Sequence, residues 1–156
     1  MPCPCARERF FSGLALWRLT GDAAPVLATV GRDLDAEDRE KSVPYRLHGL
    51  AELGGDLTPL VPRLRRHLAE HPKLVATNIA IAALLWRLHH DPTEVLPVLE
   101  AAFARLGSYA PVPDGAFSLA VELGPHAEPL LPVLRKHIAK DGVQATLRRL
   151  GALPAN

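Results

Sequence analysis

Several features that often identify a function are scarce in this chain. Aromatic residues make up 5% of its 156 residues, and the formal net charge is +1. So small a net charge gives no long-range field that would draw the whole molecule to nucleic acid or to an anionic membrane. No apolar run approaches the roughly 20 residues that a membrane-spanning helix needs, and the N-terminus lacks the apolar stretch of a secretory signal. We therefore expect a cytoplasmic protein without a membrane segment.

The chain has only two cysteines, and they form no recognisable metal or redox motif. Cys3 and Cys5 make a C-x-C pair, but no further soft ligand follows them in the sequence, whereas a structural zinc site needs four ligands. A disulfide is rare in a reducing cytosol. We expect two free thiols on a loose N-terminal tail, residues 1–7.

Motifs of catalysis are also missing. The sequence contains no glycine-rich phosphate loop, nucleophile elbow or zinc-ribbon spacing. His67 and His71 stand four residues apart, a spacing that on one helix allows two imidazoles to share a metal. A third ligand is missing, however, and Pro72 ends that helix. We expect no catalytic residue, no metal site and no cofactor.

What the sequence does contain is a repeat of about 35 residues. One leucine column recurs at spacings of 34, 35 and 35 residues: Leu19, Leu53, Leu88 and Leu123. Another apolar column contains Val30, Leu64, Leu99 and Leu134. A repeat of this period predicts a solenoid, in which each unit buries its apolar face against its neighbours.

Each repeat is predicted to be a pair of helices. Apolar residues make up 48% of the chain, and because Ala and Leu supply most of them, helices are favoured over strands. An aspartate that can cap the second helix precedes it in three repeats, at Asp22, Asp56 and Asp91, and His126 replaces it in the fourth. A second proline column should delay regular helix to about Pro62, Pro97 and Pro132. The predicted helices are 8–20, 24–34, 43–54, 58–70, 73–89, 92–106, 115–124, 127–140 and 143–151.

Charge alternates from one repeat to the next just before the leucine column. The residues are Arg18, Glu52, Arg87, Glu122 and Arg149. Stacked repeats bring equivalent positions close together, so alternating signs should attract. The column predicts a ladder of ion pairs between neighbouring first helices.

Three recurring phrases resemble bacterial HEAT-like repeats of the type also found in phycobilin lyases. They are Ala-Leu-Trp-Arg-Leu-Thr-Gly-Asp (15–22), Leu-Leu-Trp-Arg-Leu-His-His-Asp (84–91) and Glu-Leu-Gly-Pro-His-Ala-Glu-Pro-Leu-Leu-Pro-Val-Leu-Arg (122–135). The resemblance covers roughly residues 10–150. It implies an all-α solenoid of about four helix pairs and a C-terminal helix, forming one repeat domain over 1–156. It also implies a right-handed superhelix with the second helices on its concave side.

The strongest candidates for a binding site are two basic clusters at equivalent positions of the second and fourth repeats. The first cluster is Arg63, Arg66 and His67, and the second is Arg135, Lys136 and His137. Tyr109, in a proline- and glycine-rich connection, is a candidate aromatic anchor. Basic residues near a helix C-terminus also complement the helix dipole, which would give the clusters a structural role instead.

These observations favour a protein-interaction scaffold that binds a protein partner on its concave face. An enzyme subunit acting on a cofactor-bearing protein, as the lyase resemblance implies, is one alternative. A binder of nucleic-acid phosphates is another, less favoured because the basic strip is interrupted by Glu100, Ala101 and Ala102. Phe10 and Phe11 on the first helix predict self-association or a partner at that end.

Overall fold

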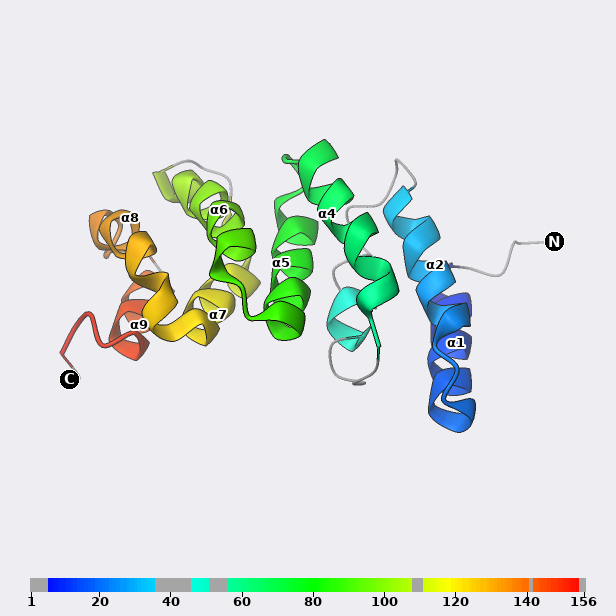
Figure 1. Ribbon diagram of the computed structural model, residues 1–156. Coiled ribbons are helices and arrows are strands. Elements are labelled where there is room, and N and C mark those ends of the chain that lie inside the picture. Colours follow the sequence, from blue (N-terminus) through cyan, green and yellow to red (C-terminus); the bar gives the residue numbers. More distant parts are fainter. Residues whose placement is uncertain (1–5, 36–45, 51–55, 108–110, 141, 155–156) are drawn as a thin grey trace. The chain divides into compact units, whose positions relative to one another are not determined.

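The computed structural model describes residues 6–35, 46–50, 56–107, 111–140 and 142–154. Regular structure in these ranges is entirely helical, which confirms the all-α fold class (Figure 1). None of the described helices has both the length and the apolar character needed to cross a membrane. The chain divides into two compact units, residues 1–84 and 85–156, which are described in turn. A repeat array has contacts only between neighbouring repeats, so a division into two units is also compatible with one array. The single repeat domain over 1–156 therefore stays a prediction.

Unit 1 is built on a helical hairpin. Its described elements are α1 (Ala6–Thr20), α2 (Ala24–Asp35), a helical segment at 46–50, η1 (Thr58–Leu60), α4 (Val61–Glu70) and the first part of α5 (Val75–His89). Helix α1 packs along α2, and α2 also packs on α4 (Figure 1). The hairpin is tight at Gly13, where a Cβ would lie 3.1 Å from the Cα of Val26. The absence of a side chain at Gly13 therefore allows the two helices to approach closely.

The core of unit 1 corrects one sequence prediction. Phe10 is 1% exposed, and the guanidinium carbon of Arg46 lies 5.9 Å from its ring centroid. Phe10 therefore belongs to the core and not to a contact surface. Leu19, expected in a packed column, is 83% exposed. The two residues exchange their predicted roles because the side of α1 that carries Phe10 and Gly13 faces inward, and Leu19 lies on the opposite side of the helix.

Unit 2 contains the end of α5 and the elements that follow it. They are α6 (Pro92–Phe103), η2 (Ala104–Gly107), α7 (Asp114–Leu123), η3 (Gly124–Leu130), α8 (Leu131–Lys136) and α9 (Val143–Arg149). Helix α6 packs on α7 and η3, and α9 packs on α7 and α8. The second apolar column is fully buried in both units, as predicted, at Val30, Leu64, Leu99 and Leu134.

Proline and aspartate set where the second helices begin. The predicted helix 58–70 is observed as η1 followed by α4, with Pro62 in the first α-helical turn, and Pro132 has the same place in α8. The prediction for Pro97 is wrong: α6 begins at Pro92 and includes Pro97. The predicted aspartate cap does form at this helix, where the Asp91 carboxylate accepts from the Thr93 backbone N–H at 2.9 Å.

The other predicted caps form as well. Asp22 accepts from the backbone N–H of Ala24 at 2.9 Å, and Asp56 from that of Thr58 at 3.0 Å. The Thr58 hydroxyl and its N–H lower the pKa of Asp56 below its usual value, because both stabilise the ionised carboxylate. In the fourth repeat, where His126 replaces the aspartate, the turn is the 3-10 helix η3 without a side-chain cap.

One rung of the predicted ion-pair ladder lies within unit 2. The guanidinium of Arg87 on α5 approaches the carboxylate of Glu122 on α7 to 3.3 Å. Both side chains are more than a third exposed, so the pair is worth about 0.2–1 kcal/mol. It confirms the alternation for this pair of repeats. Glu52 lies outside the described residues.

Candidate functional site

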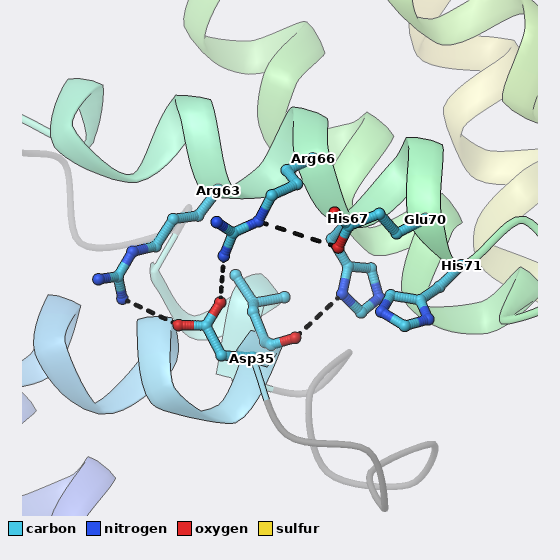
Figure 2. Close-up of a pocket in the computed structure, with 7 residues that line it drawn as sticks. Asp35, Arg63, Arg66, His67, Glu70 and His71 are labelled. Atoms are coloured by element: carbon cyan, nitrogen blue, oxygen red, sulfur yellow. Dashed lines mark hydrogen bonds and ion pairs between the residues drawn. The ribbon is translucent and has the colours of Figure 1, made fainter.

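A polar pocket opens at the C-terminal end of α2, where α4 crosses it (Figure 2). It has about 120 Å³ of free space and is lined by Leu34, Asp35, Arg63, Arg66, His67, Glu70 and His71. The residues of α4 follow helical spacing, at steps of three and four, so one face of the helix carries them all. We call this site the α2–α4 pocket.

Two arginines reach Asp35 from successive turns of α4. An N–H of Arg66 donates to Asp35 Oδ1 at 2.6 Å, and a nitrogen of Arg63 lies 3.6 Å from Oδ2 (Figure 2). Glu70 lies one turn beyond Arg66, with 3.9 Å between carboxylate oxygen and Nε. A carboxylate on the last residue of a helix meets the negative end of the dipole, and the two guanidinium groups offset that repulsion. All three side chains of this arginine–aspartate group remain roughly half exposed.

His67 forms the buried wall of the pocket. It is 7% exposed, and its Nδ1 lies 3.2 Å from the carbonyl oxygen of Leu34 in the last turn of α2. Because a carbonyl only accepts, Nδ1 carries the hydrogen, and Nε2 of the neutral ring is an acceptor. Nε2 is buried and has no hydrogen-bond partner among the described residues. The His71 ring lies beside it, with 4.6 Å between ring centroids.

Burial lowers the pKa of His67 below the ordinary 6.5, because the cationic form is poorly solvated there. The Leu34 carbonyl and the carboxylates of Glu70 and Asp35 act in the opposite direction, and burial outweighs them. At pH 7 the ring is therefore neutral. A neutral imidazole leaves two arginines and two carboxylates as the formal charges of the pocket, and these balance.

The sequence-predicted site residues divide between the two units. Arg63, Arg66 and His67 converge on the α2–α4 pocket, with His67 buried rather than at the surface. Arg135 and Lys136 are exposed at the end of α8 in unit 2, and His137 follows them, half-buried, next to Gly107. Helix α8 ends at Lys136, short of the predicted 140, and turns follow it. Tyr109 lies outside the described residues.

Sequence reasoning missed the two carboxylates of the pocket. Asp35 pairs with Arg66 across 31 residues, and Leu34 with His67 across 33. Both separations are shorter than the repeat of about 35 residues by at most about one helical turn. A search for opposite charges at the repeat spacing minus one turn would have found Asp35, and the i, i+4 spacing would have found Glu70.

The imidazole pair does not extend into a larger ligand set. In the ranges that the structure describes, no group of three or more His, Cys, Asp or Glu residues is placed to hold a metal ion. The groups that the pocket offers to a ligand are the two half-exposed guanidinium groups of Arg63 and Arg66, which can donate hydrogen bonds and form ion pairs.

Comparisons of this chain with protein-family models, with curated proteins and with solved structures find no match.

The lowered pKa of His67 predicts a loss of stability in mild acid. The unfolded chain takes up a proton near pH 6.5 and the folded protein only at lower pH, so proton uptake favours unfolding between these values. The stabilisation is complete above that window and disappears as the pH falls through it. We expect the free energy of unfolding, measured with urea between pH 7.5 and 5.5, to fall less steeply in His67→Gln than in the wild type. Equal slopes would contradict the assignment.

Proposed function

We propose that the chain is a HEAT-like helical-repeat scaffold that binds a protein partner through the α2–α4 pocket. Packing between equivalent elements supports the solenoid: α2 with α4 in unit 1, and α6 with η3 and α7 with α9 in unit 2. Each is a contact between corresponding helices of neighbouring repeats, which is how solenoids bury their apolar faces. A right-handed array of about four pairs is the fold that the proposal assumes.

The observation that carries the binding proposal is the convergence of Arg63 and Arg66 on one carboxylate. Each guanidinium has five N–H donors in a planar fork, and half of each side chain is exposed. Asp35 accepts from Arg66 and lies near Arg63, and the remaining N–H donors of the two groups can meet a second carboxylate. Arginines held in this way are frequent hot spots of protein interfaces. The chemistry that suits them is a second carboxylate, from an acidic side chain or a C-terminus of the partner.

Of the two alternatives, binding of nucleic-acid phosphates fits the pocket less well. A phosphate backbone is held by an excess of positive charge, whereas Asp35 and Glu70 balance the two arginines here. An enzyme subunit acting on a cofactor-bearing protein would use the same pocket to approach its protein substrate. Retention of an absorbing group during purification, lost in the arginine variants, would favour that second function.

The test compares variants of α4 with a matched control. The immobilised full-length chain is cross-linked to partners in native lysate, and the bound protein is identified and then measured in purified form. We expect Arg66→Ala to weaken its binding about 5- to 30-fold, the range of an interface hot spot. Arg65→Ala, an exposed neighbour outside the pocket, should leave binding within about twofold of the wild type, since contacts outside a hot spot are near neutral.

A second variant tests the direction of the effect. Asp35 competes with an incoming carboxylate for the same donors, so Asp35→Asn should strengthen binding of the acidic partner. Equal losses in Arg65→Ala and Arg66→Ala would contradict the pocket, and weaker binding in Asp35→Asn would contradict the carboxylate chemistry. A fall in affinity of about 10³-fold or more between 50 and 200 mM salt would indicate phosphate-backbone binding instead.

A further inference from the structure

Apolar side chains gather on the outer face of α1. Among the described residues, three of the four large apolar side chains that are exposed lie on this one helix: Phe11 at 40%, Leu16 at 48% and Leu19 at 83%. Phe11, Ala15 and Leu19 are spaced by four residues and so form one stripe, with Leu16 on its flank. The stripe faces away from Phe10 and Gly13, which pack inward. We call it the α1 face.

The repeat pattern shows that this face has the character of a packing surface. Leu123 occupies the position equivalent to Leu19 in the fourth repeat, and it is buried. A residue type that neighbouring repeats cover elsewhere is thus exposed on α1. Exposed apolar patches of this kind mark association sites.

Charge on α1 points to the occupant. Glu8 and Arg18 are exposed near opposite ends of the helix, and neither has an ion-pair partner among the described residues. They are ten residues apart, which is about 15 Å along the helix. Two copies of α1 packed antiparallel, with the two-fold axis near Ser12 and Ala15, would place each Glu8 beside Arg18 of the other copy. The small side chains at the crossing permit close approach of the helices.

From this self-complementarity we propose that the α1 face is the interface of a homodimer, in which α1 packs antiparallel on α1 of a second copy. Such an interface is isologous, so the pair between Glu8 and Arg18 of the other copy occurs twice by symmetry. A helix of 15 residues is about 22 Å long. One such pair of helices buries less than the roughly 800 Å² per partner of a standard stable interface. The dimer is therefore weak, with a dissociation constant on the order of 10–100 µM.

Sedimentation of the purified full-length chain between about 1 and 500 µM tests the dimer. We expect a concentration-dependent shift from monomer to dimer. We also expect a loss of at least about tenfold in association for Leu19→Ser, because Leu19 is the most exposed apolar side chain of the α1 face and the symmetric interface would bury it twice. Leu19 is exposed, so the variant should keep the wild-type thermal midpoint. A wild-type chain that stays monomeric at 500 µM, or an unchanged association in Leu19→Ser, overturns the proposal.

A charge swap tests the antiparallel arrangement. Glu8→Arg and Arg18→Glu should each weaken association about three- to tenfold, as repulsion replaces two exposed ion pairs. An equimolar mixture of the two variants should restore it, because the mixed dimer again pairs position 8 of each chain with an opposite charge at position 18 of the other.

The same variants test whether Arg18 forms its ion pair across the dimer or within its own chain, as the ion-pair ladder predicts. If Arg18 served the ladder, Arg18→Glu would lower the thermal midpoint without changing association, and the mixture would behave as its components do. Either result overturns the pairing of Glu8 with Arg18 of a second copy.

Discussion

Replacing Arg46 by Met should destabilise the protein by about 3–5 kcal/mol, the largest effect expected of any single change considered for this molecule. Arg46 and Asp33 form an ion pair whose side chains are 6% and 10% exposed. Without the guanidinium, the Asp33 carboxyl group would lose its charged partner in a site that water hardly reaches. The guanidinium also lies over the Phe10 ring, so its loss reaches the core of unit 1.

The double variant Asp33→Leu, Arg46→Met distinguishes two quantities. One is the net contribution of the ion pair to stability, and the other is the cost of leaving Asp33 buried without its partner. Two apolar side chains of similar volume should recover most of the loss and bring the protein within about 1–2 kcal/mol of the wild type. Urea unfolding at pH 7 measures all three proteins. If Arg46→Met alone loses less than about 1 kcal/mol, the pair is not buried in solution as the structure has it.

The buried pair also shows where sequence reasoning reaches its limit. Asp33 lies beside the apolar stripe of α2, and its partner is 13 residues away across a charged connection. A charged residue in an amphipathic helix is normally assigned to solvent, and no periodic signal distinguishes one that is buried with a partner. Asp33 is buried only because the chain places Arg46 beside it. A local sequence pattern does not specify that long-range placement.

Positions at which local chemistry or one neighbouring residue decides the structure were predictable. The aspartate caps at Asp22, Asp56 and Asp91 and the Arg87–Glu122 pair follow from residues that recur at one spacing. Whether an aspartate caps a helix depends on the residues beside it in the sequence. Whether an ion pair of the ladder forms depends on the contact between two neighbouring helices. Neither depends on the path of the chain elsewhere.

Equivalence between repeats failed where the surroundings differ. His67 and His137 occupy the same column, yet His67 is buried within α4 against the end of α2, whereas His137 follows the end of the shorter helix α8. In α1, Phe10 and Phe11 are adjacent and apolar residues occur on several sides of the helix. Periodicity alone could not say which side packs on α2.

The two proposed surfaces can be tested independently. The α2–α4 pocket and the α1 face share no residue, and α2 packs against α1 and against α4. Loss of dimerisation in Leu19→Ser should therefore leave the affinity for an acidic partner unchanged per monomer, while avidity on a multivalent surface should fall.

Leu134→Ala should destabilise the protein by about 2–5 kcal/mol, the usual range for a fully buried leucine in a close-packed core. The apolar column to which it belongs is buried in all four repeats, so the lost methyl groups leave a cavity at a junction between helices.

Ile138, four residues on and 41% exposed, is the matched control, and Ile138→Ala should lose less than about 1 kcal/mol, in proportion to the smaller apolar area it buries. Urea denaturation followed by circular dichroism gives both values. In the proposed repeat array, stability would be the sum of repeat and neighbour terms, and a broadened transition in Leu134→Ala would then show that unit 2 unfolds before unit 1. Equal losses in the two variants would instead mean that the column does not form the core, and the proposed repeat packing would fail with it.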